Sequence, residues 1–371
     1  MDVKAAVAYE LKKPLVVETL ELDEPGDGEV LLKIMASGIC HSDDHVRMGN
    51  YPTPLPMVLG HEGGCIVEKC GPNVSKVKEG DHCVATWMPA CHKCDYCVDG
   101  KSYLCERGAG LLDGCMLDGS YRFHTKDGQN VGQMHYLGTF TEYTVVPEES
   151  VVVIDKDLPL EKACIVGCAV PTGWGSAVRR AQVKPGSTVL VVGGGGIGTS
   201  AIQGARLAGA RMIILADTSD EKLEMHKKLG FGATHFINNA KEDLPEKIAE
   251  LTNGRGVDYA FEAIGTKPTQ AQVMEVTGKG GTSVFIGNES FFSESLPTSP
   301  EHFALWSKNL LGILYGGCNT LSDIPFLLNL YKEGHLNLDD MITKEYRLED
   351  INVAFDDMLA GKNIRGVVRF D

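Results

Sequence analysis

The ten residues VLVVGGGGIG, positions 189–198, decide how the second half of this chain folds. Four consecutive aliphatic residues predict a buried strand, and Gly193, Gly195 and Gly198 then match the pattern G-x-G-x-x-G. Glycine at these places permits a tight turn, a close approach of the backbone to a pyrophosphate, and packing of the following helix on the strand. The stretch therefore predicts a dinucleotide-binding loop; its alternative is a plain packing turn.

An acidic residue at the end of the next apolar run strengthens that prediction. Asp217 follows Met212-Ile213-Ile214-Leu215-Ala216, where its carboxylate would bind adenosine ribose hydroxyls and repel a 2′-phosphate. The sequence therefore favours NAD over NADP. Gly196 and Ile197, at the start of the expected helix, would offer backbone N–H groups to the phosphates.

The pattern of short runs divides the chain into two kinds of structure. Residues 1 to about 150 hold close, irregular β-type runs broken by glycine and proline, which predict a folded β barrel. From residue 188 onward, apolar strands alternate with helical stretches, which predicts a doubly wound parallel sheet in an α/β protein. The alternation fades after about residue 315, and residues 365–370 look like a final strand.

Composition excludes several classes of function. The 371 residues carry a formal charge of -15 and a sequence pI of about 5.2, which argues against a nucleic-acid surface. The N-terminal stretch does not look like a secretory signal, and no apolar run reaches membrane-spanning length. We therefore expect a cytoplasmic protein whose twelve cysteines stay reduced, and close cysteine spacings then favour metal binding.

Four cysteines follow the spacing C-x2-C-x2-C-x7-C. They are Cys91, Cys94, Cys97 and Cys105. Four thiolates can surround one tetrahedral zinc and leave no open position, so the spacing predicts a structural zinc site. The alternative is four unrelated buried cysteines. His92 lies among them, and we expect it to be exposed because the thiolates already complete the ion's coordination.

A second metal site with an open position would need ligands from separate loops. Cys40 lies in GICHSDDH (38–45), His61 in GHEGG (60–64), and Cys168 where the barrel gives way to the alternating pattern. Each alone is a weak signal, because a lone cysteine is more often a small core residue.

Over essentially its whole length the chain resembles the zinc-dependent medium-chain alcohol dehydrogenases, especially bacterial, actinobacterial-type members. The resemblance is carried by GICHSDDH, GHEGG, the four cysteines, GCAVPTGWG (167–175), GGGGIG with Asp217, and GKNIR (361–365). It implies a GroES-like catalytic domain (1–169 and 315–371) interrupted by a Rossmann NAD-binding domain (170–314), with the active site between them. It also implies that Cys40, His61 and Cys168 hold a catalytic zinc.

The resemblance assigns roles to the neighbours of these ligands. Ser42 matches the hydroxyl that accepts the alcohol proton, which then passes by way of the nicotinamide ribose to His45 and solvent. Asp43 matches the acid that orients the zinc-binding histidine, and Glu62 the acid beside zinc. The alternative for Ser42 is a helix-capping serine, and the alternative for His45 is an ordinary surface histidine. Asp44 has no role beyond that of a solvated turn residue.

Further positions match cofactor contacts. His41 stands where relatives place a cation, commonly arginine, on the pyrophosphate, and a histidine there holds less charge at neutral pH. Arg365 matches the second phosphate cation, and Lys222 an adenosine-ribose contact whose alternative is a solvated helix residue. Thr172 and Ile286 complete the predicted cofactor site.

The substrate pocket is predicted from Tyr51, Trp87 and Tyr136, where relatives line the channel with apolar or aromatic side chains. Three large rings favour aromatic or allylic primary alcohols; the alternative is barrel core. Glutathione-dependent formaldehyde dehydrogenases are similar, but the arginine that holds their substrate's carboxylate is replaced here by Ala109. Some actinobacterial relatives keep NAD bound through turnover.

Two classes of function remain: a zinc- and NAD-dependent alcohol dehydrogenase, and a non-catalytic NAD-binding protein of the same fold. The full set of ligand and relay residues favours the enzyme. By analogy with relatives we expect a homodimer or homotetramer, with contacts near residues 283–286 and 303–315. In the second segment, apolar residues have helical spacing that is equally compatible with core; they are Trp306, Leu310, Leu311 and Leu314.

Overall fold

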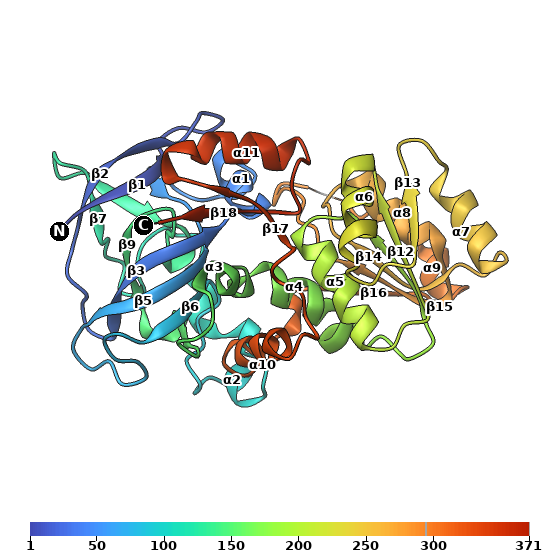
Figure 1. Ribbon diagram of the computed structural model, residues 1–371, viewed down its shortest axis with the longest axis horizontal. Coiled ribbons are helices and arrows are strands. Elements are labelled where there is room, and N and C mark those ends of the chain that lie inside the picture. Colours follow the sequence, from blue (N-terminus) through green and yellow to red (C-terminus); the bar gives the residue numbers. More distant parts are fainter. Residues whose placement is uncertain (294, 371) are drawn as a thin grey trace.

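The computed structural model describes residues 1–293 and 295–370. A β-rich domain and an α/β domain lie side by side along the long axis (Figure 1). The largest buried apolar cluster contains residues from both, among them Val84, Ile165, Trp174, Val191 and Leu327. The two domains are therefore packed together through one continuous core.

The β-rich domain holds a small barrel and a larger sheet. The barrel is closed by β1 (Asp2–Ala8), β2 (Val16–Leu22), β7 (Phe123–His124), β8 (Asn130–Gln133) and β4 (Met57–Val58). The seven-stranded sheet runs in the order β10 (Val151–Val153), β6 (His82–Thr86), β5 (Glu62–Cys70), β3 (Glu29–Gly38), β18 (Arg365–Arg369) and β17 (Ile342–Tyr346), with β9 (Tyr143–Pro147) paired to β3. The predicted final strand is thus β18, and it returns the C-terminal segment to the first domain.

The α/β domain contains a six-stranded sheet in which every pair is parallel. Its order is β13 (His235–Asn238), β12 (Met212–Asp217), β11 (Thr188–Val192), β14 (Val257–Glu262), β15 (Thr277–Phe285) and β16 (Asn309–Gly312). The helices that alternate with these strands are α5 (Gly196–Leu207), α6 (Asp220–Leu229), α7 (Leu244–Thr252), α8 (Lys267–Val276) and α9 (Pro300–Ala304). The order reverses between β11 and β14, which is where such sheets bind ligands beyond the strand ends.

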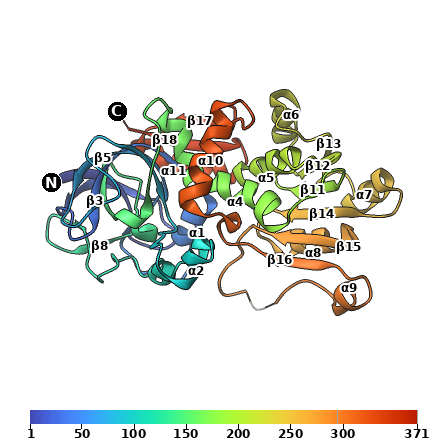
Figure 2. The same cartoon turned by 90° about the horizontal axis from the view of Figure 1, so that it is seen from below.

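The remaining helices lie in the β-rich domain or at the junction. They are α1 (His41–Met48), α2 (Asp95–Val98), α3 (Leu160–Ala163), α4 (Ala169–Gly175), α10 (Thr320–Lys332) and α11 (Ile351–Leu359). Figures 1 and 2 show α4 and α10 between the two domains. Gly173 of α4 is needed there, because a Cβ would collide with the Ile197 carbonyl of α5.

Single turns of helix connect many of these elements. They are η1 (Ser102–Leu104), η2 (Glu106–Gly110), η3 (Met134–Tyr136), η4 (Glu148–Ser150), η5 (Cys164–Gly167), the π-helical η6 (Ser176–Arg180), η7 (Tyr315–Gly317) and η8 (Leu348–Asp350). Within residues 1–293 and 295–370, no helix combines the length and apolar character needed to span a bilayer.

The helical spacing in the segment 306–314 is misleading. Leu310 and Leu311 lie in strand β16, which pairs in parallel with β15 at the outer edge of the sheet (Figure 2). The apolar run is short, so tertiary pairing rather than periodicity decides its conformation. The predicted contact between subunits at this segment stays a prediction.

Candidate active site and metal centres

Asp43 joins two loops from different parts of the β-rich domain. Cys40 is the N-cap of α1, and Asp43 in the first turn of that helix is fully buried. Its Oδ2 accepts a hydrogen bond from the Cys40 N–H (3.0 Å), and its Oδ1 accepts from the Gly60 N–H (3.1 Å). The same Oδ1 lies 2.9 Å from His61 Nδ1. Asp43 therefore fixes both Cys40 and His61 and leaves His61 Nε2 as the nitrogen available to a metal.

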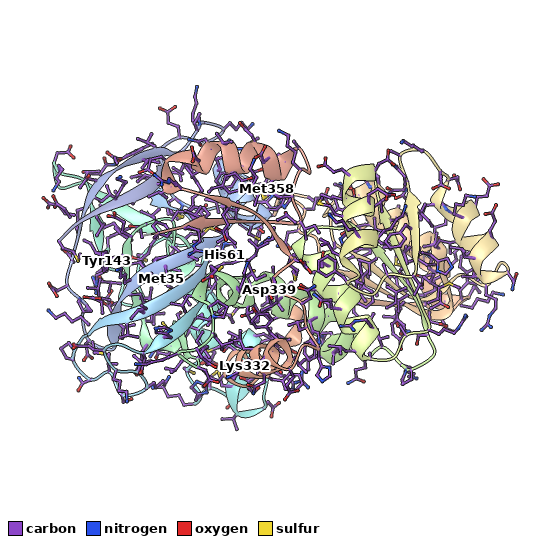
Figure 3. All side chains as sticks on the ribbon, in the orientation of Figure 1. Met35, His61, Tyr143, Lys332, Asp339 and Met358 are labelled. Carbon is purple, nitrogen blue, oxygen red and sulfur yellow. The ribbon has the colours of Figure 1, made fainter. Side chains whose placement is uncertain are left out.

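The structure brings the three residues of the predicted open site together. Cys40, His61 and Cys168 are buried, and with Glu62 they place one ligand atom each within 4.8 Å of one another. Figure 3 shows His61 at the side of the β-rich domain that faces the junction. Hydrogen bonding with Cys168 holds the pKa of Cys40 well below its usual range against the effect of burial. Such a soft, partly anionic donor set suits zinc.

Glu62 lies beside this cluster but is held by other groups. Its Oε1 forms an ion pair with Arg365 and accepts from the Ala169 N–H at 3.2 Å. Its Oε2 is buried and has no hydrogen-bond partner among the described residues. Burial raises the pKa of Glu62 to about 7, while the guanidinium of Arg365 opposes the change.

The buried side chain of Arg365 lies between the open metal cluster and the glycine loop. Besides its ion pair with Glu62, its side chain runs along the glycine loop, where a Cβ on Gly196 would come within 3.1 Å of Arg365 Cδ. Arg365 also lines the cleft between the domains. Its charge therefore reaches both the open cluster and the loop predicted for pyrophosphate.

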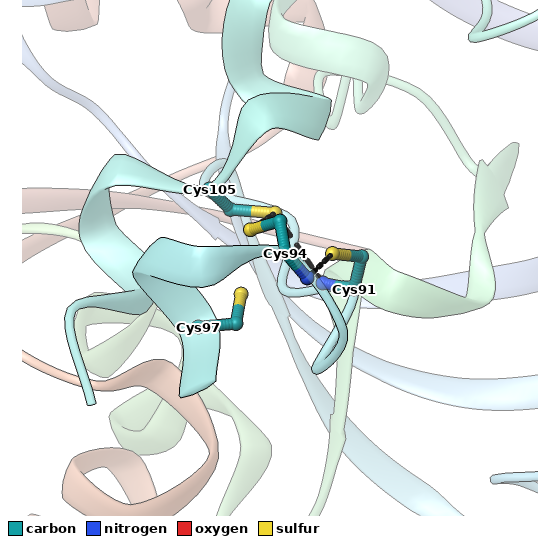
Figure 4. A group of neighbouring side chains, drawn as sticks. All are labelled: Cys91, Cys94, Cys97 and Cys105. Atoms are coloured by element: carbon teal, nitrogen blue, oxygen red, sulfur yellow. Dashed lines mark hydrogen bonds between the residues drawn. The ribbon is translucent and has the colours of Figure 1, made fainter. Parts of the chain in front are cut away.

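The four predicted cysteines of the other site converge around α2 (Figure 4). Their sulfur atoms all lie within 4.8 Å of one another, and three of the four residues are only half-buried. The Cys94 N–H donates to Cys91 Sγ and the Cys91 N–H to Cys105 Sγ, both at 3.4 Å. Backbone donors of this kind stabilise thiolates, and they lower the pKa of Cys91 to about 6 although burial opposes them. His92 is exposed.

A cleft of about 1070 Å³, open mouth included, runs from the glycine loop to Cys40. Most of the predicted cofactor residues line it; they are His41, Gly193, Gly195, Gly196, Ile197, Asp217, Lys222, Ile286 and Arg365. Cys40, Ser42 and His45 line the same cleft. It therefore connects the predicted cofactor loop with the open metal cluster.

Two predicted cofactor residues, Gly198 and Thr172, are not among the residues that line this cleft. Gly198 packs against the loop itself, because a Cβ there would collide with the Gly193 carbonyl. This is the helix-on-strand packing role of the third glycine. The hydroxyl of Thr172 is buried in α4 and has no partner among the described residues.

Asp217 holds the glycine loop in place. Its Oδ2 accepts from the Gly194 N–H at 2.7 Å, and its Oδ1 accepts from the Ser219 N–H at 2.9 Å. His226, which the sequence reasoning missed, lies behind the loop with Nε2 3.0 Å from the Gly194 carbonyl oxygen. The end of β12 and the loop after β11 are therefore fixed to one another.

The predicted relay residues lie along the cleft side of α1. Ser42 Oγ is 3.8 Å from Cys40 Sγ. His45 Nδ1 is 2.9 Å from Asn50 Nδ2, and its ring stacks on Tyr51 at 5.3 Å between centroids. Burial lowers the pKa of His45, so the imidazole is neutral at physiological pH.

His41 and Asp44 extend the same helix in different directions. The side chain of His41 is open to the cleft, where loss of bulk water lowers its pKa and the charges of Arg365 and Lys222 add to this effect. Asp44, which had no predicted role, accepts two hydrogen bonds from Arg47 at 2.9 and 2.6 Å.

The three aromatic residues predicted for the substrate pocket have different neighbours. The Tyr51 hydroxyl accepts a hydrogen bond from Asn288 Nδ2 of the α/β domain at 2.9 Å, and the Trp87 ring packs against Tyr315 with centroids 5.4 Å apart. The Tyr136 hydroxyl donates to the Arg107 carbonyl at 3.2 Å, and its place in the substrate pocket stays a prediction. The side chain beside His61 is that of His135, one residue earlier.

Sequence reasoning missed His135 because a histidine between Met134 and Tyr136 carries no motif. Both His135 and Tyr136 have positive φ angles, 51° and 63°, a backbone conformation that residues other than glycine rarely adopt. Asn50 was missed for a similar reason, since it lies one turn beyond the recognised segment that ends at His45.

Comparison with known proteins places the chain in a family. The alcohol dehydrogenase GroES-like domain family matches residues 26–156, and the zinc-binding dehydrogenase family matches residues 196–333. An NDMA-dependent alcohol dehydrogenase from Amycolatopsis methanolica is 45% identical over 370 residues, 99% of each chain. This chain belongs to the zinc-dependent alcohol dehydrogenases.

Other alcohol dehydrogenases match it over 99% or more of their length. Alcohol dehydrogenase B from Mycobacterium tuberculosis is 44% identical over 375 residues, covering 100% of this chain and 99% of that one. The crystal structure of benzyl alcohol dehydrogenase from Acinetobacter calcoaceticus superposes with a TM-score of 0.92, at 30% identity and 100% coverage of both chains. The predicted GroES-like and Rossmann architecture is confirmed.

Proposed function

We propose that the enzyme oxidises primary alcohols, aromatic or allylic ones above all, to aldehydes by hydride transfer to NAD, and that it catalyses the reverse reaction. One observation carries the proposal. Cys40, His61 and Cys168 meet at one end of the cleft whose other wall is the glycine loop with Asp217. Three nitrogen and sulfur donors leave one position of a tetrahedral zinc for the substrate.

The two cysteine-containing clusters fit zinc in different roles. Cys40, His61 and Cys168 would hold the catalytic ion; the structural ion would be held by Cys91, Cys94, Cys97 and Cys105. A catalytic zinc supplies Lewis-acid polarisation, which makes an alcohol hydroxyl more acidic. Glu62 is not assigned as a permanent ligand in this proposal, because the thiolates of Cys40 and Cys168 already neutralise the ion, and Glu62 Oε1 is engaged by Arg365 and the Ala169 N–H.

The protein groups along α1 move and hold the proton. Ser42 Oγ, next to Cys40, accepts the proton from the substrate hydroxyl, and His45 passes it to solvent. A neutral His45 can accept that proton, and the lowered pKa keeps it neutral. Asp43 orients His61 through Nδ1.

The cofactor contacts follow from the lining of the cleft. NAD, when bound, supplies the hydride acceptor at its nicotinamide. The N–H groups from Gly195 to Ile197 would face the phosphates, because those of Gly193 and Gly194 already donate to Ala216 and Asp217. Asp217 and Lys222 would face the adenosine ribose, and His41 with Arg365 would supply positive charge. The carboxylate of Asp217 disfavours a 2′-phosphate, which supports NAD over NADP.

The assignment of domains and subunits belongs to the same proposal. Residues 1–169 and 315–371 form the catalytic domain and residues 170–314 the NAD-binding domain. The exposed edge of β16 supports a homodimer or homotetramer built by strand pairing, because an unpaired edge strand is a template for a second copy.

Metal content and alcohol turnover test the proposal together. Purified enzyme should contain about two zincs per chain, and benzyl alcohol with NAD should produce absorbance at 340 nm. Benzyl alcohol, octanol, ethanol and cyclohexanol should be compared, and the same panel run with NDMA, the acceptor named for the Amycolatopsis relative. Turnover with NDMA alone would mean that NAD stays bound. Preference for cyclohexanol would overturn the substrate class, and absence of turnover on every primary alcohol with both acceptors would overturn the function.

A thiol adduct of formaldehyde is the second candidate substrate. Full-length similarity to an S-(hydroxymethyl)glutathione dehydrogenase favours this substrate. However, Ala109 stands where glutathione-dependent relatives carry the arginine that holds the adduct's carboxylate. S-hydroxymethylglutathione should therefore be turned over far more slowly than benzyl alcohol. The opposite order would reverse this ranking.

A further inference from the structure

Two aromatic side chains beside His61 carry polar atoms without partners. The ring of His135 meets that of His61 edge to face, with centroids 5.5 Å apart, and the indole of Trp87 lies 5.5 Å from His135 on another side. His135 is only 6% exposed. Its Nδ1 and the Nε1 of Trp87 are buried and have no hydrogen-bond partner among the described residues. Polar groups in protein interiors are normally paired, so these two require an explanation.

Not every polar group beside Trp87 lacks a partner. On the far side of Trp87, the Tyr315 hydroxyl donates to the Gly167 carbonyl at 2.8 Å and lies 3.1 Å from Thr86 Oγ1. Other buried polar atoms among the described residues also lack partners, for example Thr172 Oγ1 and Trp174 Nε1. His135 and Trp87 differ from these because the His135 ring packs on both the Trp87 ring and the ring of His61, a predicted zinc ligand.

The backbone holds His135 in this place at a conformational cost. Its φ of 51° and that of Tyr136, 63°, lie in the left-handed region, which side chains other than glycine rarely adopt. Such strain persists only where the surrounding structure imposes it, and it is concentrated at ligand sites. Relaxing the turn would carry the imidazole away from His61.

We propose that His135 and Trp87 form a hydrogen-bonding subsite for an oxygen atom that the alcohol substrate carries beyond its carbinol group. This inference rests on the proposed function and narrows its substrate class to oxygen-substituted aromatic alcohols. An indole N–H can only donate, and a neutral imidazole donates through one nitrogen, so an ether, methoxy or hydroxyl oxygen fits both. A methylene in the same place would leave the donors unpaired.

Isosteric alcohol pairs test the subsite directly. The pairs are 4-methoxybenzyl with 4-ethylbenzyl alcohol and 3-methoxybenzyl with 3-ethylbenzyl alcohol, and the members of each pair differ by oxygen in place of methylene. In the zinc-loaded enzyme, kcat/KM for the oxygen member of at least one pair should be higher by about tenfold or more. His135→Phe should abolish that preference by lowering only the value for the oxygen member, and Trp87→Phe should reduce it.

Tyr136→Phe is the matched control. It removes a hydroxyl from the same strained turn, but this hydroxyl points to the Arg107 carbonyl, so the ratio within each pair should not change. Zinc content of each variant shows whether His61 still binds metal after its neighbour is altered.

A binding measurement separates the subsite from catalysis. With the enzyme saturated by NADH, no hydride acceptor is present, and calorimetric titration of each alcohol pair gives a ratio of Kd values without turnover. The same preference of about tenfold, and its loss in His135→Phe, is expected. Equal affinities within each pair, or a preference that survives His135→Phe, would overturn the inference and assign the unpaired atoms to water. Failure of the proposed function looks different: no alcohol is oxidised, whatever the binding ratios.

Discussion

The two cysteine-containing clusters are built in opposite ways. Four thiols of one cluster come from the fifteen positions 91–105, lie in a loop that is only half-buried, and receive hydrogen bonds from their own backbone. The other cluster takes Cys40, His61 and Cys168 from three distant segments and buries them between domains. The first is closed and local, as a structural ion requires; the second is open and depends on the whole fold. Losing a ligand from the open cluster should therefore lower activity, whereas losing one of the four cysteines should lower stability.

The largest expected effect is that of Cys168→Ala. Removing a ligand from the open cluster should lower kcat/KM on the order of 10³-fold, because Lewis-acid stabilisation of the transition state amounts to several kcal/mol. Zinc should fall from about two ions per chain to about one. Mass spectrometry under native conditions and steady-state kinetics measure both. Cys164→Ala is the matched control: this thiol is also buried but donates to the Glu161 carbonyl outside the cluster, and its loss should change neither quantity.

Cys97→Ser should lower stability and leave activity nearly unchanged, which is the opposite of the result expected for Cys168→Ala. With one thiolate missing, the loop around α2 loses the ion that substitutes for a core, so the thermal midpoint should fall by about 5 °C or more. Enzyme that remains folded should keep kcat within about threefold. Cys115→Ala, at a half-buried cysteine outside the cluster, should leave the midpoint unchanged. A loss of kcat without a loss of stability would contradict the division of roles.

Asp43→Asn tests how the dispersed cluster is held together. The carboxylate accepts hydrogen bonds from the backbone N–H groups of Cys40 and Gly60 and orients His61. In asparagine one of the two oxygens becomes an NH2 group, which cannot accept, so at least one of these contacts is lost. Loss of such an outer contact typically costs about 10- to 100-fold in metal affinity or activity. Competition with a zinc chelator gives the affinity. Asp44→Asn, next in sequence but paired with Arg47, should change it by less than about threefold.

The same contrast explains what could be predicted from sequence. The four-cysteine cluster is contiguous, so spacing alone names its ligands and its geometry. The glycine loop is likewise local, and strand β11, helix α5 and Asp217 fall where the pattern places them. For the open cluster, the residues alone left Cys40 and Cys168 as weak candidates, and only the resemblance to a family joined them to His61.

What the sequence could not give depends on backbone turns and tertiary pairing. The positive φ angles at His135 and Tyr136 accompany a contact between His135 and His61 that no motif announces. Strand β16 overrides an apolar spacing typical of a helix because an open sheet edge is available to it. Arg365 was predicted from its match to a phosphate cation, yet its ion pair with Glu62 depends on β18 pairing with β3, whose other neighbour β5 carries Glu62.

A smaller effect is expected for Asn50→Asp, which acts through His45. A carboxylate beside Nδ1 should raise the pKa of His45 by about one unit. His45 must be neutral to accept a proton, so a raised pKa keeps it protonated to higher pH. The rising limb of kcat/KM for alcohol oxidation should move up by about one pH unit, with an unchanged plateau. In a His45→Gln background the same substitution should shift nothing; a shift there would assign the limb to another group.

The smallest expected effect belongs to His41→Arg, which changes charge beside the open cluster without touching a ligand. Loss of bulk water in the cleft and the charges of Arg365 and Lys222 lower the pKa of His41, whereas arginine is always charged and forms charge-assisted hydrogen bonds with phosphate. The Kd for NADH, measured by fluorescence titration, should fall by about three- to tenfold, and stopped-flow release should slow. The gain should shrink as ionic strength rises. His92→Arg adds the same charge beside the four-cysteine cluster and should leave the Kd unaltered. Equal behaviour of the two variants would remove His41 from the phosphate site and leave Arg365 as the cation that faces the pyrophosphate.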